Sequence, residues 1–212
     1  MPMTPPSREP SQVTLLTAGQ PLRRLRRAEL PLATVALARY LIGKVLVREH
    51  ADGRSSGRIV ETEAYPPGDP TAYHRPGLTT SNAPLFAARG HAYVRMVYGS
   101  CFNLNLAAEE PGVGGSVLIR ALEPLEGLAL MKRNYPTVKE AALTRGPGRL
   151  CAALGIGPRL SGTDLCSSER LWLERGSGRP RIQVSTRIGL SRDQHRRLRF
   201  LEHGSRFVSV PP

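Results

Sequence analysis

Two carboxylates and an aromatic ring recur at every second position of the segment 58–65, which reads Arg-Ile-Val-Glu-Thr-Glu-Ala-Tyr. Successive side chains of an extended strand point to opposite faces, so Glu61, Glu63 and Tyr65 are expected on the same face. Ile59 is expected on that face as well. A carboxylate held in this way can take a proton from water as a general base. The pattern is equally typical of surface glutamates that pair with nearby arginines.

A second group of aromatic and cationic side chains occupies residues 91–99, His-Ala-Tyr-Val-Arg-Met-Val-Tyr-Gly. The segment ends at Gly99, and glycine allows the backbone conformations of a tight turn, which would project Tyr98 outward. The alternative is a core strand whose tyrosines only bury their rings. This segment taken alone favours the core strand.

Polar residues also interrupt apolar segments further along the chain. Asn103 and Asn105 alternate with leucines, and Arg120 lies in the apolar run 116–122. Polar groups at a period of two inside apolar strands indicate that one face lines a wet cavity.

Short elements are predicted to hold these residues in place. Apolar residues at helical spacing in 31–41, with proline at the start and Gly43 after the end, predict a helix. Segments 44–49 and 57–65 predict a hairpin around an Asp52-Gly53 turn. Further elements are expected as follows: strands at 91–98, 116–122, 182–188 and 207–210, and helices near 124–134 and 148–154. The fold class is therefore α+β, with a curved, mostly antiparallel β-sheet and surrounding short helices.

One domain is expected, since 212 residues can bury a single sizeable core. It would span residues 21–212. Residues 1–20 are rich in Pro, Ser and Thr with few large apolar groups, and are expected to form a disordered N-terminal tail. The loop 66–82 contains Tyr73 and His74 among prolines and glycines, and loops of this kind often bind ligands.

The chain is strongly basic, with 30 Lys and Arg against 17 Asp and Glu and a formal net charge of +13. Such a balance favours association with a polyanion, and nucleic acid is the simplest one. A generally Arg-rich proteome would produce the same excess. The runs 23–27 and 192–199 contain four arginines each, and each could contact phosphates or form an exposed, solvated segment.

Several classes of protein and site are disfavoured by composition. Three cysteines, Cys101, Cys151 and Cys166, form no Cys-x-x-Cys pair and are expected to be reduced, buried thiols. No run of about 18 apolar residues could span a bilayer, and no signal-peptide pattern is present. A cytoplasmic location is expected, associated with the nucleoid in a bacterium. The histidines lack ligand-like spacing, so neither metal nor cofactor is expected.

Taken together, these motifs resemble the alkyladenine, or 3-methyladenine, DNA glycosylase family. The resemblance runs in collinear order over residues 30–210, and the string Arg-Ala-Leu-Glu-Pro-Leu-Glu-Gly is highly specific. The segments that carry it are 61–65, His74, 93–99, Asn105, 118–127, 144–151 and 172–176.

The resemblance implies an enzyme that binds double-stranded DNA containing a damaged purine, acts as a monomer, and swings one nucleotide into a pocket. By the same resemblance, Glu63 is the general base that activates water. Arg120 helps to hold that water or an adjacent phosphate. Tyr98 is the wedge that fills the emptied position in the base stack. No lysine is suitably placed for Schiff-base chemistry, so strand nicking is not expected.

The resemblance also implies a set of groups that contact the flipped base. Tyr65 and His74 line the pocket, and Asn105 discriminates among purines by crowding the exocyclic group of guanine. Arg95 is a departure, because the family usually has a tyrosine there that stacks on the base. A guanidinium that faces a cationic alkylpurine would repel it, so Arg95 is expected to shift the substrate preference toward neutral lesions such as hypoxanthine. Alternatively, the Arg95 side chain turns away from the base to a phosphate.

These roles agree with elementary chemistry. An N-alkylated adenine is already cationic, so it leaves readily, needs little acid catalysis, and is attracted to aromatic faces. One carboxylate can then suffice, unlike the paired carboxylates of ordinary glycosidases. Two rival interpretations remain: a non-catalytic basic nucleic-acid-binding protein on the same fold, and an RNA-binding module that stacks bases on Tyr93 and Tyr98.

Overall fold

The computed structural model describes residues 23–211. The tail predicted for residues 1–20 lies outside the described residues. The α-helices and β-strands are α1 (Thr34–Leu41), β1 (Val45–His50), β2 (Gly53–Tyr65), β3 (Ala92–Val97), β4 (Cys101–Ala107), β5 (Ser116–Glu126), α2 (Leu128–Asn134), α3 (Pro147–Ala153), β6 (Leu171–Glu174), β7 (Ile182–Ser185) and β8 (Arg199–Glu202). Short 3₁₀ turns lie at Arg27–Glu29, Ala83–Phe86, Glu140–Ala142 and Pro158–Leu160.

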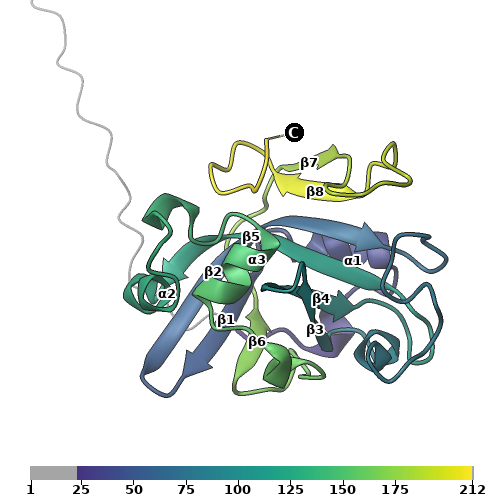
Figure 1. Ribbon diagram of the computed structural model, residues 1–212, viewed down its shortest axis with the longest axis horizontal. Helices are drawn as coiled ribbons and strands as arrows, with labels where there is room; N and C mark the ends of the chain where they lie inside the picture. Colours follow the sequence, from purple (N-terminus) through teal and green to yellow (C-terminus); the bar gives the residue numbers. More distant parts are fainter. Residues whose placement is uncertain (1–22, 212) are drawn as a thin grey trace, which may run out of the picture.

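The strands form one antiparallel sheet that curls around the core (Figure 1). Its main order is β3-β4-β5-β2-β1-β6, while β8 pairs with both β2 and β7. The two longest strands, β2 and β5, pair with each other along most of their length. The predicted α+β class, with a curved antiparallel sheet and short helices, is confirmed.

Strand β2 changes partner along one edge. Its first part, from Gly53 to Arg58, pairs with β1, and Glu61 to Glu63 pair with β8. The pairing with β5 is irregular between Ile59 and Glu61. Such an irregularity disrupts strict alternation of side chains, and Ile59 packs in the main core beside Ala64. The prediction that Ile59 shares the face of the two glutamates is therefore wrong.

The helices are short and cover the long strands. In Figure 1, α1 lies behind β2 and β5, whereas α3 lies in front of them. Apolar groups from α1, α2, α3 and seven strands join one continuous core, which includes Leu37, Leu104, Ile119 and Leu150. The burial of this core supplies most of the driving force for folding. Among residues 23–211, no helix is long and apolar enough to cross a membrane.

Several predicted elements have different bounds. The helix expected at 31–41 begins at Thr34, and the hairpin of β1 and β2 is confirmed. The helix expected near 124–134 starts only at Leu128, because β5 continues through Pro124 opposite Gly57. The strand expected at 207–210 is absent from the described residues, where this segment forms turns and bends.

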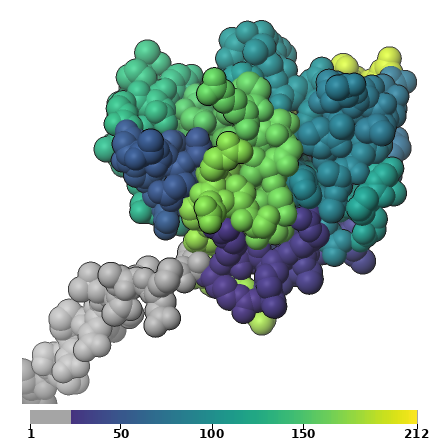
Figure 2. Space-filling view, turned by 90° about the horizontal axis from the view of Figure 1, so that it is seen from below, coloured from purple at the N-terminus to yellow at the C-terminus, as the bar shows by residue number. Residues whose placement is uncertain are grey.

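The N-terminal end of the described chain is part of the fold. Leu25 donates its backbone N–H to the carbonyl oxygen of Leu173 at 2.9 Å, and the backbone of Arg24 pairs with that of Glu174 in an isolated antiparallel β-bridge. Figure 2 shows the corresponding contact between the purple N-terminal segment and the green segment that contains β6.

Candidate active site

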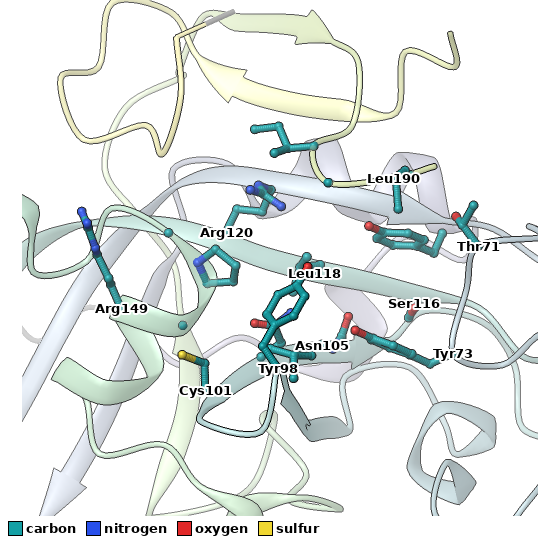
Figure 3. Close-up of a pocket in the computed structure, with 18 of the residues that line it drawn as sticks. Thr71, Tyr73, Tyr98, Cys101, Asn105, Ser116, Leu118, Arg120, Arg149 and Leu190 are labelled. Atoms are coloured by element: carbon teal, nitrogen blue, oxygen red, sulfur yellow. The ribbon is translucent and has the colours of Figure 1, made fainter. Parts of the chain in front are cut away.

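A cavity of about 450 Å³ opens between the β3–β4 hairpin, strand β5 and the start of α3. Its volume lies in the range of about 300 to 1,000 Å³ that is typical of small-molecule sites. Asn103 and Asn105 of β4 and Arg120 of β5 line it, as the period-two pattern predicted, and Leu118 of β5 lines it as well. Figure 3 shows Arg120, Leu118 and Asn105 facing the same space as Tyr73 and Tyr98.

Glu63 is fully buried, and its carboxylate is held on three sides by groups of the cavity wall. Oε1 accepts the backbone N–H of Ile188 at 2.8 Å, and Oε2 accepts the hydroxyl of Tyr65 at 2.8 Å. Arg120 Nη1 lies 3.2 Å from Oε2. Ile188, Tyr65 and Arg120 all line the cavity. The carboxylate therefore lies directly behind the wall, held in one orientation.

Arg120 bridges Glu63 and a second buried carboxylate. Its Nε donates to Glu61 Oε1 at 3.1 Å. Glu61 Oε1 also accepts from Arg199 Nη1 at 3.0 Å, and both the hydroxyl and the backbone N–H of Ser209 donate to this carboxylate. Two carboxylates and two guanidiniums thus neutralise one another in the interior, an arrangement that requires full pairing to be stable.

Tyr65 is kept neutral and oriented by its surroundings. Burial raises the pKa of the Tyr65 hydroxyl, which therefore remains protonated and donates to Glu63. The guanidinium of Arg187 lies 4.6 Å from the centroid of the Tyr65 ring, and its Nη1 is 2.7 Å from Asp69 Oδ2. Because Arg187 and Asp69 are themselves buried, this stack fixes the ring.

The β3–β4 turn places Tyr98 at the mouth of the cavity, where the residue is 91% exposed. Tyr98 has φ of 51°, a left-handed conformation that non-glycine residues rarely adopt. The expectation that Tyr98 projects outward at a turn is confirmed. Asn105 of β4 is buried and lines the same cavity, and its Nδ2 has no hydrogen-bond partner among the described residues.

Besides Glu63, which lies behind the wall, two of the sequence-predicted residues are outside the set that lines the cavity, His74 and Arg95. His74 is buried within the loop 66–82, where its Nε2 lies 3.1 Å from the carbonyl oxygen of Pro66, and burial lowers the pKa of its imidazole. Arg95 is exposed, and its guanidinium lies 4.6 Å from the centroid of the Tyr73 ring. Arg95 Nη1 also donates to the Tyr93 hydroxyl at 3.2 Å. Tyr73 itself lines the cavity.

The cavity wall is cationic. Among the described residues that line it are Arg120, Arg145 and Arg149, and no Asp or Glu. Basic groups of this kind suit the phosphates of a nucleic acid. The carboxylates of Glu61 and Glu63 lie behind this wall, where both pair with Arg120.

Much of the two arginine runs is engaged within the fold. In the run 23–27, Arg24 lies 4.7 Å from the Trp172 ring and Arg27 Nη2 is 2.6 Å from Asp164 Oδ2. In the run 192–199, Arg196 Nη1 is 3.1 Å from Asp69 Oδ2, and Arg199 is buried against Glu61.

The predicted burial of the cysteines holds for one thiol. Cys151 is buried, whereas Cys166 is partly buried and Cys101 is exposed. Cys101 begins β4 directly after the tight turn, so its side chain lies at the rim of the cavity rather than in the core.

A family model described as methylpurine-DNA glycosylase (MPG) matches residues 29–206, which is most of the chain. The chain belongs to the methylpurine-DNA glycosylase family. Membership makes it a DNA glycosylase, a class of DNA repair enzyme, and confirms the resemblance drawn from the motifs.

Relatives from distant organisms agree with this family. A Paraburkholderia phytofirmans protein that carries a 3-methyladenine DNA glycosylase name is 53% identical over 90% of each chain. A Mesorhizobium japonicum protein with the same name is 50% identical over 92% of this chain and 95% of its own. The human DNA-3-methyladenine glycosylase is 39% identical over 83% of this chain and 64% of its own length.

Several contacts of the site could not be seen as motifs. The N–H of Ile188 is a backbone group, so side-chain type gives no sign of it. Arg199 and Ser209 bind Glu61 from segments more than 130 residues away along the chain. Tyr73 did carry a signal, since it is an aromatic residue in a loop otherwise rich in Pro, Gly and Thr.

Proposed function

We propose that this DNA glycosylase flips a damaged purine out of duplex DNA and hydrolyses its N-glycosidic bond with a water activated by Glu63. The observation that carries the proposal is the buried Glu63 carboxylate, held by Arg120, Tyr65 and the Ile188 N–H at the wall of a cavity of about 450 Å³. A fixed carboxylate needs no rearrangement when charge develops on the sugar, and such preorganisation is a major source of catalysis.

In the proposed reaction, Glu63 takes a proton from a water molecule as the water oxygen attacks C1′ of the flipped nucleotide. The bond between C1′ and the purine nitrogen breaks, and its electron pair leaves with the base. A cationic alkyladenine departs as a neutral base, so no acid is required for that substrate. The Glu63 carboxylate also stabilises the positive charge that develops on the sugar, while Arg120 orients the carboxylate and holds the water or the adjacent phosphate.

The proposed base contacts follow the positions of the side chains. Tyr65 forms part of the wall beside Glu63, and Asn105 limits the space available to an exocyclic group. The unpartnered Asn105 Nδ2 is a donor that a purine acceptor could satisfy. His74, neutral at pH 7 because burial lowers its pKa, supports the loop behind the base and does not line the described cavity.

Tyr98 is proposed as the group that enters the duplex. An exposed ring at the mouth of the cavity can occupy the gap in the base stack while the nucleotide lies inside. Extrusion of a base costs a few kcal/mol, least for a damaged or mispaired base, so the insertion of Tyr98 would offset part of that cost.

The enzyme is proposed to be monofunctional and to act as a monomer on double-stranded DNA. No lysine is among the described residues that line the cavity, which supports hydrolysis without a Schiff base. The product should then be an intact strand with an abasic site that breaks only on treatment with alkali.

The test is a single-turnover assay on duplexes that carry one hypoxanthine or one 3-methyladenine, each followed by alkaline cleavage. Glu63→Gln should lower the rate constant by about 10²- to 10⁴-fold, as expected for loss of a general base, without loss of DNA binding. Glu126→Gln, the same change at an exposed position of β5, is the matched control and should excise normally. Excision by Glu63→Gln at the rate of this control would reject the proposal, and binding without product by the unmodified protein would favour a non-catalytic role.

A further inference from the structure

Four tyrosines line the cavity: Tyr65, Tyr73, Tyr98 and Tyr135. A purine held there needs an aromatic face, because base–aromatic stacking is a major source of affinity for unstacked nucleotides. Tyr98 is exposed at the mouth. Tyr65 has its hydroxyl committed to Glu63 and one face covered by Arg187. The ring of Tyr73 enters the cavity from the loop 66–82, close to Asn105 and Tyr98 (Figure 3).

Two neighbouring side chains hold the Tyr73 ring in place, and a third holds the backbone of its loop. It packs edge to face on Tyr93, with centroids 6.1 Å apart and an interplanar angle of 64°. Arg95 lies against the ring at 4.6 Å from its centroid. Asn82 Nδ2 donates to the carbonyl oxygens of Tyr73 and Gly77 at 3.0 Å and 2.9 Å, which closes the loop. A ring fixed in this way loses little conformational freedom when a base stacks on it.

We infer that Tyr73 is the ring on which the flipped purine stacks, and that Arg95 acts through Tyr73 as a positioning residue. This inference rests on the proposed function and names a specificity-determining residue for it. The structure favours Tyr73 over Arg95 as the group that touches the base, because Tyr73 lines the cavity and Arg95 does not.

The position of Arg95 has a consequence for the class of purine that is preferred. A guanidinium on a tyrosine ring is attracted by the electron-rich face, so the ring already interacts with one cation. A second cation stacked on this ring is repelled by Arg95, whereas a neutral purine is not. The stacking site of Tyr73 therefore favours neutral lesions such as hypoxanthine over cationic alkylpurines, relative to the same ring without Arg95.

The main test replaces the ring and measures single-turnover excision of hypoxanthine. Tyr73→Phe keeps the ring and should retain the rate constant, while Tyr73→Leu should lower it by about 5- to 150-fold, the equivalent of one lost stacking interaction. Tyr73→Met, an unbranched side chain that fills irregular space, gives the same readout if the leucine variant fails to fold. Tyr40→Leu, the same change in α1 away from the cavity, is the matched control.

The second arm tests Arg95 with Arg95→Gln, which keeps a polar side chain and removes the charge. The ratio of the 3-methyladenine rate constant to the hypoxanthine rate constant should rise in this variant. The rise should be smaller in the Tyr73→Leu background, since Arg95 acts through the ring. An equal rise in both backgrounds would overturn the positioning role.

Failure of the inference differs from failure of the proposed function. If the unmodified protein excises hypoxanthine and Glu63→Gln does not, the proposed function holds. Excision by both Tyr73→Leu and Tyr73→Met at the rate of the Tyr40→Leu control would then overturn the role of Tyr73 alone. If the unmodified protein releases no base from either duplex, both proposals fall.

Discussion

Replacing Glu61 by Gln should destabilise the protein strongly, because the change leaves two buried guanidiniums short of one negative charge. Glu61 has zero exposure and binds Arg120 Nε at 3.1 Å and Arg199 Nη1 at 3.0 Å. Arg120 retains Glu63, but Arg199 loses its carboxylate and is itself buried. The four side chains are neutral together in the folded protein and carry one net positive charge in the variant.

The magnitude follows from this geometry. Removing one partner of a buried ion pair costs about 3–5 kcal/mol, and a chain of this size loses about 2–4 °C of Tm for each kcal/mol. The expected fall in Tm is therefore about 6–20 °C. Excision should also slow, since Arg120 would lose the contact that aligns it beside Glu63.

Thermal unfolding followed by circular dichroism gives the Tm, and Glu123→Gln supplies the matched control. Glu123 pairs with Arg58 on the same two strands, but its side chain is 30% exposed. A partly exposed pair of this kind is worth about 1 kcal/mol or less, so the Tm of this control should fall by at most about 2–4 °C. Equal Tm values for the two variants would refute the reasoning that full pairing of Glu61 stabilises the site.

Three further predictions concern the mouth of the cavity, the DNA-binding surface and the loop. Tyr98→Asn should weaken binding to a duplex with an abasic-site mimic by about 5- to 150-fold. The Tm of this variant should stay unchanged or rise, because asparagine tolerates a left-handed φ. A large fall in Tm would show instead that Tyr98 packs against other residues. Arg149→Gln should reduce the slope of log Kd against the logarithm of the salt concentration by about 0.9. The control Arg24→Gln should leave this slope unchanged, because Arg24 lies on the Trp172 ring within the fold. Equal slopes for the two variants would count against a phosphate contact at Arg149. Burial lowers the pKa of His74 below its ordinary 6.5, so the unfolded chain binds more protons and the folded state loses stability as pH falls below that value. The free energy of unfolding in urea should therefore differ between about pH 7.5 and about pH 5.5, and this difference should be smaller in His74→Gln. An unchanged difference would contradict the burial of a neutral imidazole.

The elements that could be predicted from the sequence are those in which side chains decide the structure. The alternation of Asn103 and Asn105 with leucines correctly indicated a strand with one face in the core and one in a cavity. The Asp52-Gly53 turn and the two strands that flank it were also predicted correctly. These patterns work because burial of apolar groups and the two-residue period act on the same residues.

The failures lie where backbone groups bind side chains instead of neighbouring strands. The strand expected at 182–188 ends at Ser185, and Ile188 donates its N–H to Glu63. The strand expected at 207–210 does not form, and the N–H of Ser209 binds Glu61. A backbone N–H that donates to a carboxylate cannot also donate to a neighbouring strand, so the strand ends there. The accepting glutamate is more than 120 residues away along the chain in each case, and no local sequence pattern reveals it.

The candidate site shows the same limit. Glu63, Tyr65, Asn105 and Arg120 were placed by strand alternation and by likeness to a family, and the fold brings them together. The resemblance implied that Arg95 replaces a stacking tyrosine, yet the Arg95 side chain lies on Tyr73 outside the cavity lining. Only the three-dimensional arrangement shows that an aromatic ring reaches the cavity from a different loop.

Under the proposed function, the left-handed backbone at Tyr98 has a consequence for how the enzyme meets DNA. A bulky residue at φ of 51° is held there by the tight turn between β3 and β4, and it costs about 1 kcal/mol or more relative to glycine. That cost is met once, during folding, and not at each encounter with a base pair. Under the proposed function, the direction in which the backbone projects this side chain is therefore set before the protein meets DNA, and the turn needs no closing movement before the ring enters the duplex.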